Sequence, residues 1–150
     1  MSELVDLYPY RLISEPEFFL GRRSEDHQYA GQWRMVGGKV KRGEKAWEAA
    51  LRELKEELNT TPRLFWSPPT LNQFYEPSSD RVLHIPVFAA ELFSEQQITL
   101  NSEHITYQWV TIDRAEHYIQ WPEQLRILKL IHNILRSKEI IDDWIIVDNP

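Results

Sequence analysis

The chain has 150 residues, of which 42% are hydrophobic, and its 17 Lys and Arg against 23 Asp and Glu give a formal charge of −6. This length favours one domain over residues 1–150, and the acidic balance argues against binding of long nucleic acid, which relies on many basic side chains. The sequence contains no Cys, which excludes disulfides, zinc–thiolate sites and Cys nucleophiles.

The chain begins with Met1–Asp6, which lacks the basic start and apolar stretch of a secretory signal. No later apolar run reaches the ~20 residues that cross a bilayer. We therefore expect a cytoplasmic protein that does not interact with membranes.

Short strands are expected in the first third of the chain. Tyr8–Ile13 and Phe18–Arg22 have the composition of two strands, joined by a polar turn at Ser14–Glu17. Trp33–Val36 is a candidate third strand, and we expect Gly37–Gly38 to break it. The polar segment before that strand is expected to form an exposed loop.

Strands and one more helix are expected after residue 60. Leu64–Tyr75 and Arg81–Leu92 have the pattern of longer strands, and Thr106–Thr111 that of a shorter one. Trp121–Arg136 places Leu and Ile on one helical face, and Trp144–Val147 either adds an edge strand or packs on the surface. Together with a helix over residues 44–58, this order predicts an α/β fold, a sandwich with a mixed β-sheet.

The segment Glu44–Leu58 has a strong helical pattern. Its core-facing side is expected to carry Trp47, Ala50, Leu51, Leu54 and Leu58. Its other side carries Glu53, Glu56 and Glu57, flanked by Arg52, because residues three and four apart are neighbours on a helix. One interpretation is a solvated acidic face partly neutralised by Arg52 and Lys55. The other is a site for Mg²⁺, which prefers oxygen ligands.

The spacing of this segment favours the metal site. Five residues separate Gly38 from Glu44, and seven more precede Arg52–Glu57, which reads Arg-Glu-Leu-Lys-Glu-Glu. This pattern resembles the Nudix box, in which Gly, five residues, Glu and seven residues precede Arg-Glu-aliphatic-any-Glu-Glu. The box then continues with any residue, Gly and an aliphatic residue.

The match departs from the box at its end. Asn59 stands where the box has Gly, and Thr60 replaces the aliphatic residue. Asn is the residue that best tolerates the left-handed conformation of a helix C-cap after Gly, and Pro62 then prevents continuation of the helix. Neither change removes a carboxylate, so we expect activity to be retained.

The resemblance implies a Nudix-like α/β/α sandwich, with divalent metal bridging substrate phosphates. It assigns Mg²⁺ or Mn²⁺ to Glu53, Glu56 and Glu57, with Arg52 orienting the carboxylates and Glu44 supporting the site near the helix start. Without the resemblance, Arg52 would be a surface ion-pair partner and Glu44 a helix cap.

Two further segments resemble particular branches of the family. Arg22, Arg23 and the run Gly37-Gly38-Lys39 are spaced from the glutamates as in the bacterial members that act on oxidised guanine triphosphates. We expect Gly38 and Lys39 to contact phosphate, whereas each Arg is either a phosphate contact or a solvated strand end. A homodimer is an expectation from the family alone.

The second segment, Glu103–Trp109, reads Glu-His-Ile-Thr-Tyr-Gln-Trp and resembles the dihydroneopterin triphosphate pyrophosphatases. In those relatives the Glu of this segment joins the metal site and is a candidate base, and the resemblance carries that role to Glu103. The alternative for Glu103 is an ordinary loop glutamate. We expect His104 to be a hydrogen-bonded loop residue.

The residues that bind the ring of the substrate are harder to assign. Trp33, Phe74 and Tyr75 are aromatic candidates for stacking, and Glu76 or Asn72 for contacting the ring edge. Trp33 is also a candidate core residue.

Four functions remain open from the sequence. The leading one is Mg²⁺-dependent hydrolysis of a nucleoside or pterin triphosphate to monophosphate and pyrophosphate. A second is hydrolysis of nucleoside diphosphate sugars, dinucleoside polyphosphates or capped RNA, the last disfavoured by the acidic charge. A third is a non-catalytic nucleotide sensor, disfavoured because all box carboxylates are retained. The fourth, a plain acidic helix surface, predicts no stabilisation by Mg²⁺.

Overall fold

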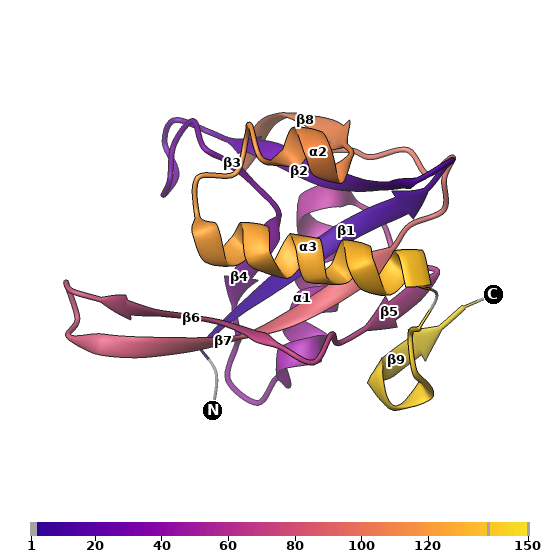
Figure 1. Ribbon diagram of the computed structural model, residues 1–150. Coiled ribbons are helices and arrows are strands. Elements are labelled where there is room, and N and C mark those ends of the chain that lie inside the picture. The colour runs from indigo at the N-terminus through magenta and orange to yellow at the C-terminus, as the bar shows by residue number, and fades with distance from the viewer. Residues whose placement is uncertain (1–2, 138, 150) are drawn as a thin grey trace.

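The computed structural model describes residues 3–137 and 139–149 and contains the predicted α/β fold with a mixed sheet (Figure 1). The strands are β1 (Leu4–Leu12), β2 (Pro16–Arg23), β3 (Trp33–Arg34), β4 (Val36–Lys39), β5 (Leu64–Trp66), β6 (Leu71–Glu76), β7 (Arg81–Glu91), β8 (His104–Val110) and β9 (Ile145–Asp148). The helices are α1 (Ala46–Leu58), α2 (Ile112–Ala115), α3 (Pro122–Ser137) and the 3₁₀ turn η1 (Asp142–Trp144).

The strands follow the order β3-β2-β1-β7-β5-β9, and β4, β6 and β8 pair with β1, β7 and β2 respectively. β1 and β7 run parallel, whereas their other partners run antiparallel, which makes the sheet mixed. β1 therefore lies at the centre of the molecule, between strands that contribute to the main cleft.

Two helices cover opposite faces of the sheet, α1 on one and α3 on the other (Figure 1). The alternation of side chains along β1 explains this: Val5 and Leu7 pack with the α1 layer, whereas Tyr8 and Tyr10 pack with the α3 layer. The predicted apolar faces of both helices are confirmed. Fully buried Leu54 alone contributes roughly 1.5–3 kcal/mol relative to an exposed Leu.

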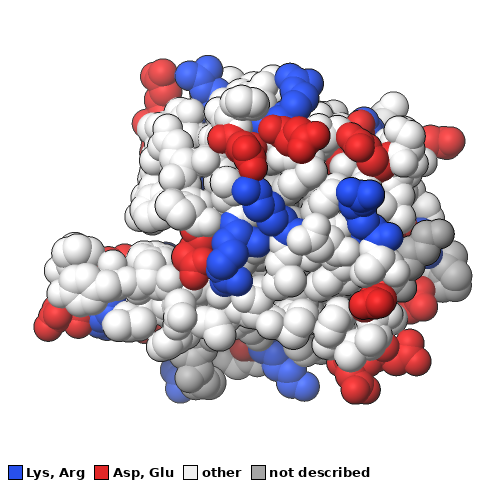
Figure 2. Space-filling view, viewed as in Figure 1, with Lys and Arg blue, Asp and Glu red and all other residues white. Residues whose placement is uncertain are grey.

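The outer surface of α3 is polar. Acidic and basic side chains are interspersed on the face shown in Figure 2. Along α3, Arg126 pairs with Glu123, and Lys129 pairs with Glu116. No helix within residues 3–137 and 139–149 is both long and apolar enough to span a membrane.

Three expected strand boundaries were wrong. β1 begins at Leu4, four residues earlier than expected. Gly37–Gly38 does not break a strand but lies inside β4, where these residues pair with Asp6 and Val5 of β1. The expected strand Leu64–Tyr75 is divided into β5 and β6, because two prolines fall in the middle of it and proline cannot donate to a strand ladder.

The C-terminal segment adopts one of the two arrangements expected of it. β9 pairs antiparallel with β5 and forms an edge strand, and the Trp144 ring before it stacks on Trp66 at a centroid distance of 6.2 Å. The short α2 and η1 helices were not predicted, because four and three residues carry too little periodicity.

Asn59 ends α1 in the way expected from its position in the box. Its backbone angles are φ 54° and ψ 43°, and its N–H donates to the Lys55 carbonyl. Gly readily adopts this left-handed conformation and Asn tolerates it. For most other residues it is costly, because the Cβ lies too close to the following carbonyl oxygen. Asn59 therefore replaces the usual Gly without displacing the helix end.

Substitution of Asn59 tests this explanation. We expect Asn59→Ala to lower the free energy of unfolding by about 1 kcal/mol, because Ala is strained at positive φ, whereas Asn59→Gly should lie within about 0.5 kcal/mol of wild type. Urea unfolding measures both. The matched control is Asn133→Ala, at an exposed position within α3, where Ala is a better helix former. Equal stability of wild type and Asn59→Ala would contradict the explanation.

Candidate active site

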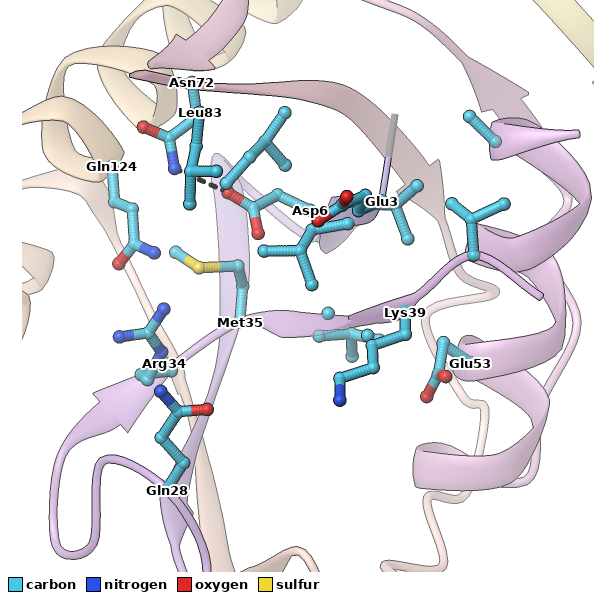
Figure 3. A pocket seen from close by; sticks show the side chains of 18 of the residues that line it. Glu3, Asp6, Gln28, Arg34, Met35, Lys39, Glu53, Asn72, Leu83 and Gln124 are labelled. Atoms are coloured by element: carbon cyan, nitrogen blue, oxygen red, sulfur yellow. Dashed lines mark hydrogen bonds between the residues drawn. The ribbon is translucent and has the colours of Figure 1, made fainter. Parts of the chain in front are cut away.

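A cleft of about 1730 Å³ opens beside β4 (Figure 3). Its lining comes from β1, β4, β6, β7, the start of α3, the loop before α1 and the Glu53 turn of α1. In Figure 3 Glu53 and Lys39 lie toward one end, and Arg34, Gln124 and Asn72 toward the other. The two ends have different chemistry.

Three carboxylates meet at the first end. Glu53, Glu57 and Glu103 each offer one oxygen, and these oxygens all lie within 4.8 Å of one another. Glu53 and Glu57 are one turn apart on α1, and Glu103 immediately precedes β8, which brings it in from the other side. The Oε2 atom of Glu57 is buried and accepts no hydrogen bond within the described part of the chain.

The electrostatics of this cluster disfavour three bare negative charges. Burial, together with the charges of Glu103 and Glu53, raises the pKa of Glu57 to about 10. Burial also raises the pKa of Glu53, against the opposing effect of Arg52. A divalent cation would reverse both effects by neutralising the carboxylates. The all-oxygen donor set and the unpartnered Glu57 oxygen fit a hard cation.

His104 contacts Glu57 in the protein interior. Its Nε2 lies 2.8 Å from Glu57 Oε1, and both side chains are buried. Burial lowers the pKa of His104 to about 4, so the neutral imidazole makes a hydrogen bond rather than a full ion pair. Gly21 of β2 gives the ring its space, because a Cβ there would lie 2.4 Å from His104 Nδ1. His104 is thus hydrogen-bonded, as expected, but it is the first residue of β8 rather than a loop residue.

Arg52 organises the exposed side of the cluster. Its guanidinium donates to Glu44 at 2.8 and 3.0 Å, to Glu53 Oε1 at 2.8 Å and to the Lys39 carbonyl at 2.8 Å. The hydrogen bonds from Arg52 and from the Lys41 N–H lower the pKa of Glu44 to about 2. The guanidinium therefore joins the loop before α1 to the carboxylate helix.

Gly38 has the close approach that the box motif suggests, but its contact is with protein. A Cβ at Gly38 would lie 2.3 Å from the Glu53 carboxyl carbon, so any larger residue would displace that carboxylate. The glycine in β4 and the glutamate in α1 are therefore fitted to one another. Lys39, the next residue, lines the cleft with its side chain exposed.

The solvated acidic face, the alternative to a metal site in the sequence analysis, is only partly present. Glu53 and Glu57 are buried, because β4 and the segment around His104 cover this side of α1. Glu56 is 48% exposed and lies 3.3 Å from Arg52, outside the cluster of three. The structure thus brings together Glu53, Glu57 and Glu103, but not Glu56.

The remaining candidate residues divide into two groups. Arg23 lines the cleft, as Lys39 does, and one of its guanidinium nitrogens is 3.9 Å from Glu103. Arg22, Trp33 and Tyr75 do not line it.

Each of these three has another environment. Arg22 is exposed on β2, the Trp33 ring packs 5.3 Å from that of Tyr118 beside the core, and Tyr75 donates to Asp80 on the exposed β6–β7 hairpin. In strands neighbouring residues point to opposite faces, which is why Phe74 lines the cleft and Tyr75 does not.

The far end of the cleft was largely missed from the sequence. Asp6, Arg34 and Gln124 line it together with Asn72, for which contact with the ring edge was considered. The signal for Asp6 was available, since an ionisable residue stands inside the apolar run Leu4–Leu12. Gln124 gave no such signal, because a Gln in a helix is ordinary.

Comparison with known proteins agrees with the geometry. The sequence model of the NUDIX domain matches residues 11–131. The asymmetrical bis(5'-nucleosyl)-tetraphosphatase of Caenorhabditis elegans is 26% identical over 121 residues, which are 79% of this chain and 85% of that protein. The nucleoside triphosphatase NudI of Escherichia coli is 27% identical over 97 residues, 60% of this chain and 69% of the relative.

A solved structure extends the likeness to the fold. The binary complex of C. elegans Ap4A hydrolase superposes with a TM-score of 0.76 at 23% identity, covering 91% of this chain and 99% of that one. The matched domain spans the carboxylate helix, Gly38 and Glu103, the residues on which the cluster is built. The chain belongs to the Nudix family and is a hydrolase of nucleotide-like substrates.

Proposed function

We propose that the chain hydrolyses a nucleoside triphosphate-like substrate, a nucleotide or a pterin triphosphate, to a monophosphate and pyrophosphate with Mg²⁺. The observation that carries the proposal is the placement of the carboxylate cluster at one end of a cleft whose other end is lined by polar and aromatic side chains. The phosphate chain would lie between them, where Lys39 and Arg23 also line the cleft.

Glu53, Glu57 and Glu103 are the residues that would hold the cation. Mg²⁺ is usually held by a few carboxylates together with substrate phosphates, and when bound it supplies positive charge to the phosphate oxygens. Mn²⁺ has the same oxygen preference. Glu56, assigned as a ligand by the resemblance, remains close enough to Arg52 to be oriented by it.

The chain's own residues perform the remaining work. Lys39 and Arg23 attract the phosphates, and Arg52 keeps the Glu53 carboxylate directed at them. A water oxygen attacks phosphorus, the anhydride P–O bond breaks, and the phosphorylated leaving group departs with the electron pair. Glu103 is our candidate for accepting the proton of the water, because it belongs to the cluster yet is only partly buried.

A second candidate function comes from the curated relatives. The name of the C. elegans relative describes a dinucleoside tetraphosphatase, whose substrate carries two nucleosides. Such a substrate would place its second nucleoside beyond the carboxylate cluster. The two functions therefore differ in their products rather than in the carboxylates that they use.

A product analysis separates these functions. The purified chain is incubated with Mg²⁺ and either nucleoside triphosphates, a pterin triphosphate or dinucleoside tetraphosphates, in ¹⁸O-labelled water. We expect monophosphate and pyrophosphate from a triphosphate, with the label in only one of them, which identifies the attacked phosphorus. Release of inorganic phosphate, or efficient cleavage of the dinucleoside compounds alone, would overturn the proposal. Binding without any turnover would indicate a sensor instead.

A further inference from the structure

The far end of the cleft contains buried polar atoms without partners. Asp6, Asn72 and Gln124 line it and are 8%, 4% and 2% exposed. Asn72 Oδ1 and Gln124 Oε1 make no hydrogen bond within residues 3–137 and 139–149. Buried polar atoms are nearly always satisfied, so atoms left open beside a cleft mark a place where a ligand supplies the partner.

One hydrogen bond determines which atom of the Asn72 amide is left without a partner. Asn72 Nδ2 donates to Asp6 Oδ2 at 2.9 Å, drawn as the dashed line in Figure 3, so the Asn72 oxygen is the atom left open. Asp6 Oδ1 also receives no bond from the described residues. Two acceptor oxygens are therefore available to hydrogen-bond donors of a ligand, and Asn72 Oδ1 is the one that is buried without a partner.

A donor faces the same end of the cleft. The Arg34 guanidinium lies 4.0 Å from the centre of the Tyr29 ring and 5.6 Å from that of Trp121, and its hydrogen bond to Gln32 is long, at 3.4 Å. Arg34 and Asp6 do not form an ion pair within 4.0 Å among the described side chains. Burial raises the pKa of Asp6 and lowers that of Arg34, and the charge of each residue opposes that shift in the other. Donor and acceptors are thus held on either side of a gap.

The walls of this gap suit a flat ring. Phe74 and Trp121 line it and pack against one another, with their ring centres 6.1 Å apart and their planes tilted by 48°, and Met35, Leu83 and Ile85 add apolar surface. Aromatic and thioether side chains pack favourably against planar heterocycles. Polar groups at the edge and apolar walls are what a site for a nucleobase-like ring requires.

We propose that Asp6, Asn72, Gln124 and Arg34 form a ring-recognition site for a 2-amino-4-oxo-pyrimidine edge, the edge shared by guanine and pterin rings. The ring N–H and the neighbouring amino group donate to the oxygens of Asp6 and Asn72. Arg34 donates to the ring carbonyl, and the Gln124 amide supplies one donor and one acceptor. This inference rests on the proposed function, since it names the ring of the same substrate.

The arrangement discriminates against adenine. The edge of adenine presents a ring nitrogen that accepts, where guanine presents an N–H that donates. That nitrogen would face the acceptor oxygens of Asp6 and Asn72 and leave all three atoms unpaired in a buried site. A site built to receive hydrogen bonds rejects ligands that lack the donors much more strongly than an apolar pocket does.

Binding of non-hydrolysable triphosphates tests the ring site separately from catalysis. Calorimetry with Mg²⁺ compares α,β-methylene analogues of GTP, of inosine triphosphate, which lacks the amino group, of ATP and of a pterin triphosphate. We expect the guanine or pterin analogue to bind at least about 30-fold more tightly than the ATP analogue, with inosine between them. Whichever of the GTP and pterin triphosphate analogues binds more tightly identifies the kind of ring that the site takes. Equal or tighter binding of the ATP analogue would overturn the proposal.

Two variants extend the test. Asp6→Asn keeps the shape but replaces one acceptor by a donor, and we expect it to reduce the guanine-to-adenine ratio at least about 10-fold. Gln124→Met serves as a second variant if Asp6→Asn does not fold. It should weaken binding of the guanine analogue more than binding of the ATP analogue. The control is Asp113→Asn on α2, an exposed residue remote from the cleft. An unchanged ratio in a folded Asp6→Asn protein would overturn the assignment even if the chain cleaves triphosphates.

Discussion

Glu57→Gln is expected to lower kcat/KM by more than ~100-fold while the protein stays folded, since even residues that only orient metal ligands typically contribute 10–100-fold. Gln keeps the size of the side chain and its contact with His104, but it cannot carry the negative charge that a divalent cation requires. Steady-state kinetics measure the loss. Thermal unfolding with and without Mg²⁺ measures the second consequence, which is that Mg²⁺ stabilises the wild type but not the variant.

Two other glutamates make this test specific. Glu95→Gln, in an exposed loop outside the cluster, should leave both activity and stabilisation by Mg²⁺ unchanged. Glu56→Gln tests the assignment of Glu56 as a metal ligand. That assignment comes from the family resemblance, whereas the structure places Glu56 outside the cluster of three. Full stabilisation by Mg²⁺ in Glu57→Gln would contradict the assignment of Glu57 as a ligand.

Arg52→Lys is expected to have the second largest effect, a loss of about 10–100-fold in kcat with a smaller change in KM. The guanidinium serves Glu44, Glu53 and the Lys39 carbonyl simultaneously, and a Lys ammonium cannot reproduce that planar, forked geometry. Arg52 positions Glu53 and has no role as a proton acceptor. The shape of the pH–rate profile should therefore be unchanged while its height falls.

The matched control for Arg52→Lys is Arg63→Lys. Arg63 donates to Glu91 at 2.6 Å, in an ion pair remote from the cleft. That variant should retain its kcat even if its stability decreases. If both Lys variants lost activity equally, the effect of Arg52→Lys would be one of stability rather than of position.

Much of the fold was predictable because its signals are local. Short segments of the sequence carry the 3.6-residue periodicity of α1 and α3 and the residues of the turn between β1 and β2. Asn59 indicated where α1 ends. The division of β5 from β6 was also signalled, by the prolines between them. The pairing of Gly37 and Gly38 with β1 could not be predicted, since a glycine-rich strand resembles a loop until its partner strand is known.

The site was predictable to the extent that one motif contains it. The box spacing identified Glu53, Glu57 and Arg52, and the segment resemblance identified Glu103. The burial of Glu57 by His104 depends on β8 approaching from a distant part of the sequence. Asp6, Arg34 and Gln124 come from three separate elements, so no spacing could connect them before the sheet order was known.

The stretch from Arg34 in β3 to Gly38 in β4 has a consequence for which bond of a substrate is broken. Arg34 at the ring end and Gly38 at the carboxylate end are separated by a stretch of at most roughly 13 Å, at ~3.3 Å per extended residue. The stretch is held at both ends, since Arg34 pairs with Gly21 of β2 and Val36–Gly38 pair with β1. If the ring site and the carboxylate cluster act as proposed, this fixed separation would set how many atoms lie between the ring and the broken bond. Substrates with extra groups at their distal end should be cut at the same position.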